Sequence, residues 1–199
     1  MTEIDLDQYY FKPEEEVICG ELVPPITESH DFDYDNYPSV VERYYKKYYY
    51  FRNNDIAEAH TLLNHSNGIC LVGLADTHIA VKKGIKSITF DVGGVDRSKN
   101  QVSGKGKRGA MQLQATTCLA IVTCEDDTTY RVASTTQGKL VEVNEDLLSN
   151  PKLIGQDGDG YIAVVLPKLE KCQQQLELLS NEEEYQAKLK EHTESNKIV

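Results

Sequence analysis

The sequence lacks several features that would assign a protein to a class at once. It contains no run of eighteen apolar residues, the length that a membrane-spanning helix needs. Its start, Met1 to Asp5, has neither a basic group nor an apolar stretch, so we expect no secretory signal peptide. Its 5 cysteines include no pair in CxxC spacing. This argues against a zinc ribbon or a disulfide scaffold and predicts free thiols in a reducing compartment.

Basic residues are outnumbered: 21 lysines and arginines face 32 aspartates and glutamates, for a formal net charge of −11. The excess lies at the two ends, with −10 over residues 1–40 and −3 over 170–199. Residues 41–57 carry +2, and residues 58–169 are neutral. A globally basic nucleic-acid-binding protein is therefore excluded, although a local basic patch is not. The 199 residues have room for one domain plus tails, or for two very small domains.

The first 38 residues are acidic and hold four of the 6 prolines, so we predict a mostly disordered leader over 1–38. Five of the 12 tyrosines then follow within seven residues. A helix here would place Tyr44, Tyr45 and Tyr48 on one stripe, with Ser39 as its N-cap. Two interpretations stay open: a short helix docked on the core, or an exposed aromatic and basic surface for a partner.

From residue 59 onward the pattern changes to short strands separated by turns. Asn67-Gly68 predicts a hairpin with positive φ at both residues. Further strands are expected over 87–92, 117–124, 130–132, 140–143 and 161–166. We therefore predict a mainly β barrel or sandwich over 39–169, preceded by the tyrosine-rich helix. Residues 170–199 read as a flexible or helical polar tail, with a possible helix over 180–192.

Familiar catalytic and metal-binding patterns find no support in the chain. The GxGxxG match at 104–109 leads into a strand rather than a helix, so we reject nucleotide binding. The half calcium loop at 157–160 has Lys168 where the last ligand should stand. No nucleophile elbow or distinctive acid pair is visible. We expect no enzyme activity, no metal and no cofactor.

One local charge feature stands out. Five bases fall within twelve residues, with no acid between them: Arg97, Lys99, Lys105, Lys107 and Arg108. Such a run is either an ordinary solvated surface or a contact surface for an anionic partner, such as the phosphates of RNA.

Two family resemblances enter at this point. The runs GKLVEVNEDL (138–147) and GDGYI (158–162), with Asn150-Pro151 between them, resemble the C-terminal half of the glycine cleavage system H protein family. This resemblance implies a lipoyl/biotinyl-type barrel-sandwich hybrid, a flattened body of two sheets.

The second resemblance covers residues 38–169, which look like the Abitram family (actin-binding transcription modulator, also called Simiate). It is carried by five runs in order: PSVVERY (38–44), HSNGIC (65–70), LADTH (74–78), VSGKGKRGA (102–110) and GYIAVVLPK (160–168). It implies a non-enzymatic protein that binds monomeric and filamentous actin and regulates actin polymerisation, filopodia and the branching of neuronal processes. It also implies a transcription-related pool in nuclear speckles beside a cytoplasmic pool in actin-rich cell projections.

The two resemblances differ in chemistry. A lipoyl carrier needs a lysine at a hairpin tip, because the cofactor is joined to its amine. In register with the 138–147 run, that position falls at Asp127, and no lysine occurs from Met111 to Gly138. We therefore predict a scaffold without carrier function. Lys105, Lys107, Arg108 and the tyrosine cluster are the candidate partner contacts, joined by Arg97 and Lys99. A mitochondrial lipoyl carrier and an RNA-associated nuclear protein stay as alternatives.

Overall fold

The structure is a computed structural model and describes residues 16–18, 21–23 and 38–197. Its strands are β1 (Glu16–Ile18), β2 (Glu21–Val23), β3 (Tyr45–Phe51), β4 (Ala59–His65), β5 (Cys70–Leu74), β6 (Ile85–Thr89), β7 (Asp91–Val92), β8 (Val95–Asp96), β9 (Gln112–Leu113), β10 (Cys118–Cys124), β11 (Thr129–Ala133), β12 (Gly138–Val143) and β13 (Ala163–Pro167). Its α-helices are α2 (Val40–Tyr44), α3 (Ile79–Lys83), α4 (Asp146–Ser149), α5 (Leu169–Leu176) and α6 (Glu182–Lys197). Four short 3-10 turns join them: η1 (Arg52–Asn54), η2 (Ile56–Glu58), η3 (Arg97–Lys99) and η4 (Pro151–Leu153).

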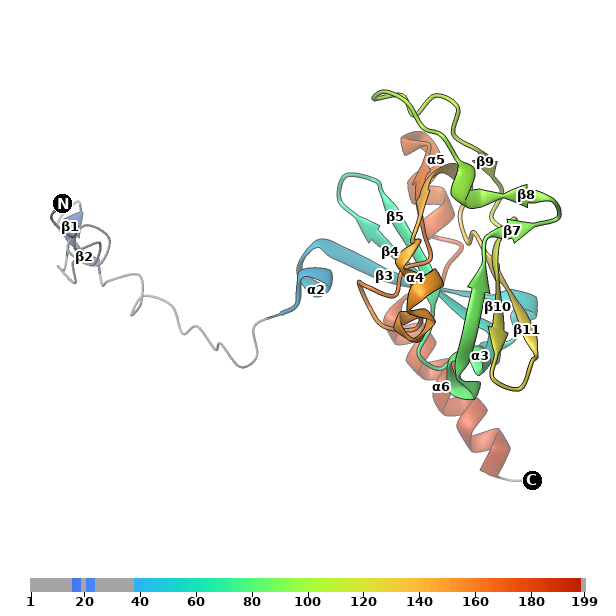
Figure 1. The fold of residues 1–199 in the computed structure, drawn as a ribbon. Helices are drawn as coiled ribbons and strands as arrows, with labels where there is room; N and C mark the ends of the chain where they lie inside the picture. The colour runs from blue at the N-terminus through green and yellow to red at the C-terminus, as the bar shows by residue number, and fades with distance from the viewer. Residues whose placement is uncertain (1–15, 19–20, 24–37, 198–199) are drawn as a thin grey trace, which may run out of the picture. The chain divides into compact units, whose positions relative to one another are not determined.

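Two open antiparallel sheets form the body of the residue 40–199 unit (Figure 1). One has six strands in the order β3-β4-β5-β13-β12-β9, and the other has three in the order β11-β10-β6. Side chains from both sheets share the core. Leu119 of β10 packs with Leu62 and Leu140 of the larger sheet, while Ile88 and Val122 pack with Leu74. The predicted mainly β, two-sheet architecture is confirmed, and neither sheet closes into a barrel.

The predicted β4–β5 hairpin is also confirmed, but its turn differs in detail. His65 donates its backbone N–H to the Ile69 oxygen, and Gly68 donates to the His65 oxygen. Gly68 has φ of 87°, whereas Asn67 is not in the positive-φ region. A type I turn that ends in one left-handed residue explains this, because such a loop needs positive φ only at its last position.

The predicted tyrosine-rich helix is wrong beyond Tyr44. Helix α2 ends there, and the next seven residues form β3, paired with β4 from Tyr45↔His65 to Phe51↔Ala59. Tyrosine suits a pleated, half-buried surface, and the full ladder with β4 stabilises the extended form. The tyrosines therefore alternate between the two faces of the sheet instead of sharing a stripe.

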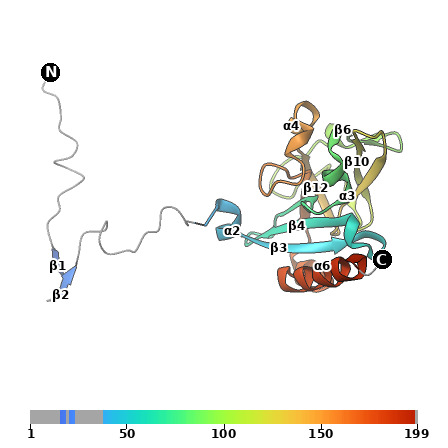
Figure 2. The ribbon, with the colours of Figure 1, turned by 90° about the horizontal axis from the view of Figure 1, so that it is seen from below.

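The C-terminal residues that the sequence presented as a polar tail are packed against the sheet. Leu176 of α5 and Tyr185 of α6 are buried. Between the two helices, Ser180 exchanges backbone hydrogen bonds with Tyr49 of β3, at N···O distances of 2.8 and 3.0 Å. Figure 2 shows α6 lying along β3. Residues beyond 169 therefore lie in the same compact unit as the sheets, and α6 runs past the predicted end at residue 192.

The acidic leader falls mostly outside the described residues. Within it, β1 and β2 pair antiparallel, from Glu16↔Val23 to Ile18↔Glu21. The four described cysteines, Cys70, Cys118, Cys124 and Cys172, are free thiols, as predicted. None of the described helices is long and apolar enough to cross a membrane.

Candidate functional site

The structure divides the five predicted basic contacts into two groups. Arg97, in η3, turns toward the body: one terminal nitrogen lies 3.6 Å from the Met111 sulfur and the other donates to the Cys118 carbonyl at 3.4 Å. Lys99 is 81% exposed and lies 3.3 Å from a carboxylate oxygen of Asp96. Arg97 is therefore a packing residue, and Lys99 is a solvated one with an acid beside it.

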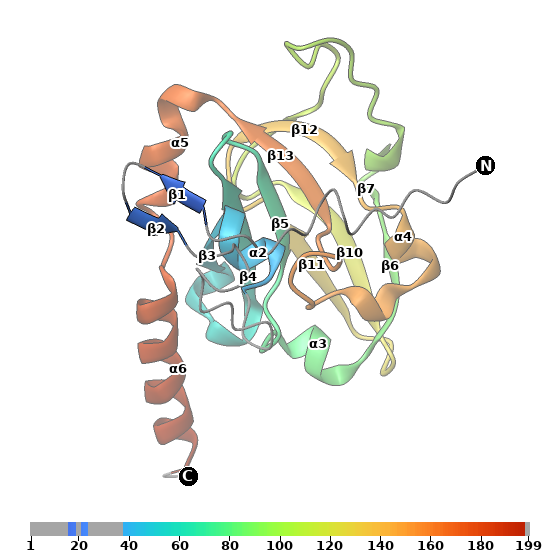
Figure 3. The same cartoon turned by 90° about the vertical axis from the view of Figure 1, so that its left-hand side faces the viewer.

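The other three bases lie on one projecting loop, which we call the basic loop (residues 103–109). Ser103 and Arg108 exchange two backbone hydrogen bonds, at 3.0 and 2.9 Å. Lys105 and Arg108 are exposed, while Lys107 is half buried and has φ of 50°. Lys139 of β12 donates to the backbone oxygen of Gly106 at 2.6 Å, a contact with no sequence signal. Figures 1 and 3 show this loop standing out from the sheets.

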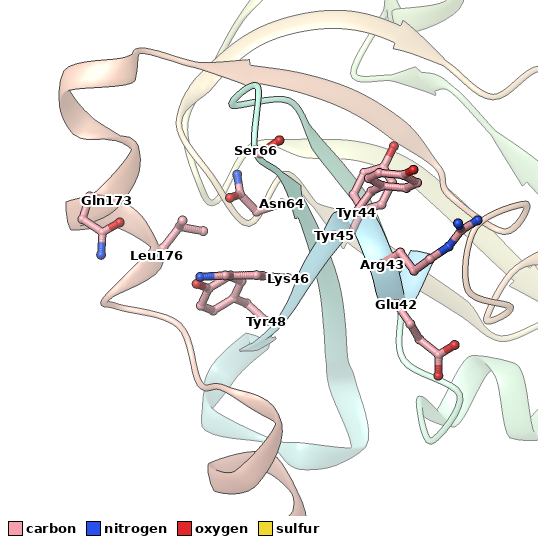
Figure 4. A pocket seen from close by; sticks show the side chains of 10 residues that line it. All are labelled: Glu42, Arg43, Tyr44, Tyr45, Lys46, Tyr48, Asn64, Ser66, Gln173 and Leu176. Atoms are coloured by element: carbon pink, nitrogen blue, oxygen red, sulfur yellow. The ribbon is translucent and has the colours of Figure 1, made fainter. Parts of the chain in front are cut away.

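The predicted aromatic contacts gather at a pocket of about 460 Å³ (Figure 4). Tyr44, Tyr45 and Tyr48 all line it. The rest of its lining comes from α2, β3, the β4–β5 hairpin and α5: Glu42, Arg43, Lys46, Asn64, Ser66, Gln173 and Leu176. No pattern in the sequence indicates the α5 wall, because residues 170–199 read as a polar tail.

Aromatic contacts hold the mouth of this pocket. The rings of Tyr44 and Tyr45 lie 6.3 and 5.0 Å from the ring of His65. Arg43 lies over the Tyr44 ring at 5.2 Å. In Figure 4, Lys46 and Tyr48 point toward Leu176 of α5. The pocket therefore combines aromatic faces, one apolar wall, two cationic groups and the carboxylate of Glu42.

The basic loop stands apart from α2 and β3, which carry the tyrosines, in both Figure 1 and Figure 3. The predicted contacts thus form two surfaces, one basic and one aromatic. A single flat partner surface that covers all eight residues does not follow from this arrangement.

A third feature is the β10–β11 hairpin tip, which contains Asp127, the position expected from the sequence to correspond to a carrier's cofactor lysine. Asp126 and Asp127 are exposed there, and Asp127 has φ of 60°. Lys83 lies 2.7 Å from Asp126, and Lys86 lies 2.6 Å from Asp127. Hydrogen bonds from Lys83 and then from Thr128 lower the pKa of Asp126 to about 2. Within the described residues, no group of three His, Cys, Asp or Glu side chains could hold a metal ion.

Comparison with known proteins shows the family of the chain. Protein Abitram of Drosophila melanogaster is 47% identical over 191 residues, covering 95% of this chain and 86% of that protein. The chain belongs to the Abitram family. Protein Abitram of Homo sapiens is 39% identical over 158 residues, covering 75% of this chain and 86% of its own length. That of Dictyostelium discoideum is 31% identical over 137 residues.

The glycine cleavage H-protein family model matches residues 107–192 of this Abitram-family chain. The match includes β9 to β13, the β10–β11 hairpin tip and α5. It supports the predicted H-protein-like, carrier-type scaffold. A crystal structure of a glycine cleavage system H protein from Mycobacterium marinum is similar, with 17% identity and a TM-score of 0.48, over 71% of this chain and 94% of that chain.

Proposed function

We propose that this Abitram-family chain is a non-enzymatic actin-binding protein that regulates actin polymerisation, filopodia dynamics and the branching of neuronal processes. The proposal includes a cytoplasmic pool in actin-rich cell projections and a nuclear pool at speckles with a transcription-related role. Family membership supports it, together with an H-protein-like scaffold in which an aspartate occupies the predicted carrier position.

The observation that carries the proposal is the basic loop. It brings Lys105, Lys107 and Arg108 together in a chain whose net charge is −11. The two backbone hydrogen bonds between Ser103 and Arg108 fix the loop's shape before a partner arrives. A preformed basic projection suits the acidic surface of actin, because opposite potentials favour encounter and register.

Charge reversal of the loop tests the proposal. We expect Lys105→Glu, Lys107→Glu and Arg108→Glu together to weaken co-sedimentation with filamentous actin about tenfold or more at physiological salt. Each exposed pair contributes on the order of 0.5 kcal/mol, and reversal replaces attraction by repulsion. The matched control reverses three exposed lysines on other elements: Lys82, Lys152 and Lys190. If the loop variant co-sediments with filamentous actin as well as the wild type does, the basic loop is not the actin contact.

RNA binding is the second candidate, because the same three bases could contact phosphates. RNA affinity would then fall steeply as salt rises, since each neutralised phosphate releases counterions. The loop variant would lose RNA affinity and keep actin binding. Failure of the wild-type chain to bind RNA at low salt would rule this candidate out.

A further inference from the structure

Strand β3 forms one edge of the six-stranded sheet, and only one side of it pairs with β4. Tyr49 directs both its N–H and its carbonyl away from β4, because both bond to Ser180. Backbone groups of successive strand residues point to alternate sides. The N–H and carbonyl groups of Tyr45 and Lys47 therefore also point outward, along the sheet edge.

Among the described residues, the chain covers only part of this edge itself. Ser180 pairs with Tyr49, and an antiparallel continuation would place residue 182 opposite Lys47. Helix α6 begins at Glu182, so the backbone turns away from the edge there. In the part of the chain that the structure describes, no other strand pairs with the outward side of Tyr45 and Lys47. These outward-facing groups form a template for another strand.

The pocket adjoins this open part of the edge. Lys46, between the two outward-facing residues, and Tyr48, next to Lys47, point into it, and Leu176 of α5 closes the far wall (Figure 4). Its volume of about 460 Å³ accepts several side chains. Because side chains alternate along a strand, every second residue of an added strand would enter the pocket.

The positive charge around the pocket indicates which kind of added strand would bind there. Residues 41–57 carry +2 in a chain of −11. Lys46 is exposed and makes no ion pair among the described residues, whereas Lys47 is paired with Asp157 at 2.7 Å. An acidic side chain that enters the pocket would meet the ammonium of Lys46.

We propose that the open part of the β3 edge, at Tyr45 and Lys47, binds an extended acidic peptide segment of a partner protein by strand addition. Backbone hydrogen bonds to the edge supply affinity, and the pocket selects alternate side chains. The segment at Ser180 is the chain's own example of this pairing. The surface is separate from the basic loop, so its test is independent of actin binding.

The first experiment uses the full chain and a short blocked peptide of alternating glutamate and valine, with binding measured by calorimetry. Lys47→Pro removes the outward N–H but leaves the β3–β4 ladder, since that N–H does not face β4. Lys47→Ala is its matched control, because both variants lose the ion pair with Asp157. We expect Lys47→Pro to bind at least about fivefold more weakly than Lys47→Ala, the loss that a missing hydrogen bond brings. Equal affinities overturn the proposal.

The second experiment tests the charge. Lys46→Glu should weaken binding of the same peptide several-fold, while Lys190→Glu, an exposed lysine of α6, should bind as the wild type does. A peptide of alternating lysine and valine should bind at least about tenfold more weakly. Equal binding of the acidic and basic peptides overturns the proposal, as does the absence of binding by the acidic one.

The third experiment needs no protein variant, so it stands even where Lys47→Pro fails to fold. Only one edge of an added strand pairs with β3. N-methylation of all the glutamate amides, or of all the valine amides, should therefore abolish binding in one peptide and spare it in the other. Equal effects overturn strand addition. The wild-type chain could instead dimerise as its concentration rises, and Lys47→Pro could abolish that dimer. This result would assign the edge to a second copy of the chain and overturn the proposal of a partner peptide.

Discussion

Two buried histidines lie side by side where β4 meets α3. The ring of His60 donates from Nδ1 to the Glu58 carbonyl at 2.9 Å, and its Nε2 accepts from the Ala133 N–H at 3.1 Å. His78 accepts the Ala80 N–H on its own Nδ1 at 3.0 Å and so caps α3. The rings lie edge to face, with centroids 5.6 Å apart. Each ring uses one nitrogen as an acceptor, which requires the neutral form.

This arrangement disfavours protonation in the folded state. Burial lowers the pKa of His60 to about 4, and the charge of Arg52 adds to the effect. Burial lowers the pKa of His78 to about 3, with repulsion from His60 and Arg52 contributing. In the unfolded chain both rings regain the ordinary value of about 6.5. The unfolded state therefore binds more protons as pH falls below that value, and stability is lost.

We predict that the free energy of unfolding declines from pH 7.5 to pH 5 by up to about 1.4 kcal/mol per pH unit for each of the two histidines. His78→Asn should flatten this dependence, because asparagine can still accept the Ala80 N–H as a cap but does not titrate. Urea unfolding at several pH values measures it. The window stays above pH 5, where Asp126, with its pKa lowered to about 2, remains ionised.

The matched control is Ala187→Asn, on the exposed surface of α6, which introduces the same side chain without removing a titratable group and should keep the wild-type pH dependence. If the stability of His78→Asn depends on pH as steeply as that of the wild type, the role given to the buried pair is contradicted.

The sequence could not reveal this pair, because His60 and His78 are eighteen positions apart and neither carries a motif. It equally gave no reason to separate Arg97, held by Cys118, from the projecting bases of the basic loop.

At the scale of elements, α6 shows how a polar helix can belong to a core. The ring of Tyr185 stacks on Tyr49 of β3, with centroids 3.7 Å apart and an interplanar angle of 8°. Its hydroxyl hydrogen-bonds to Thr77, and Tyr49 donates to Glu182 at 2.6 Å. Lys188 lies over the ring of Phe51 at 4.2 Å. A few side chains on one face thus dock a helix whose composition is otherwise polar.

We predict that Tyr185→Ala lowers the free energy of unfolding by about 3 kcal/mol or more, since it removes a buried ring and leaves a cavity. Tyr185→Phe should cost only about 1 kcal/mol, for the hydrogen bond to Thr77. Tyr44→Ala, at a ring that is 53% exposed, should change stability little. Chemical denaturation measures all three. Faster exchange of the Tyr49 amide in Tyr185→Ala would show that α6 also holds Ser180 at the edge.

Similar losses of stability for Tyr185→Ala and Tyr44→Ala would show that α6 does not stabilise the sheet.

The same elements show where prediction from the sequence failed. Between Val40 and Phe51 eight of the twelve residues are apolar or aromatic, so a helical stripe and a strand alternation fit equally well. Pairing with β4, a tertiary interaction, decides for the strand. The strands after residue 59 were predictable because alternation and turn residues agree there.

At the scale of the whole molecule, the two-sheet scaffold was predictable and its assembly was not. The run at 138–147 and the family model at 107–192 agree on the H-protein-like scaffold. Neither indicates that α5 packs against the core through Leu176 and supplies Leu176 and Gln173 to the pocket. Long-range packing of this kind leaves no local pattern in a sequence, because its partners lie more than a hundred residues apart.

The scaffold also sets what the hairpin tip can do chemically. Carrier proteins use a neutral lysine amine as the nucleophile that receives the cofactor. Here two acids occupy the tip, and the lysines beside it come from α3 and β6. The hydrogen bond to Asp126, then that to Tyr130, raises the pKa of Lys83. The hydrogen bond to Asp127 raises the pKa of Lys86. Both shifts keep these amines protonated and thus poor nucleophiles.

We therefore predict that the full chain, produced together with a lipoate ligase, keeps its unmodified intact mass. The physical reason is that Asp127 offers no amine at the tip, while Lys83 and Lys86 are held as ammonium groups 2.7 and 2.6 Å from carboxylates. A glycine cleavage H protein produced with the same ligase is the positive control and should gain one lipoyl group. A lipoyl adduct on any lysine of this chain would restore the carrier hypothesis, and its position by peptide mapping would show whether these ion pairs open.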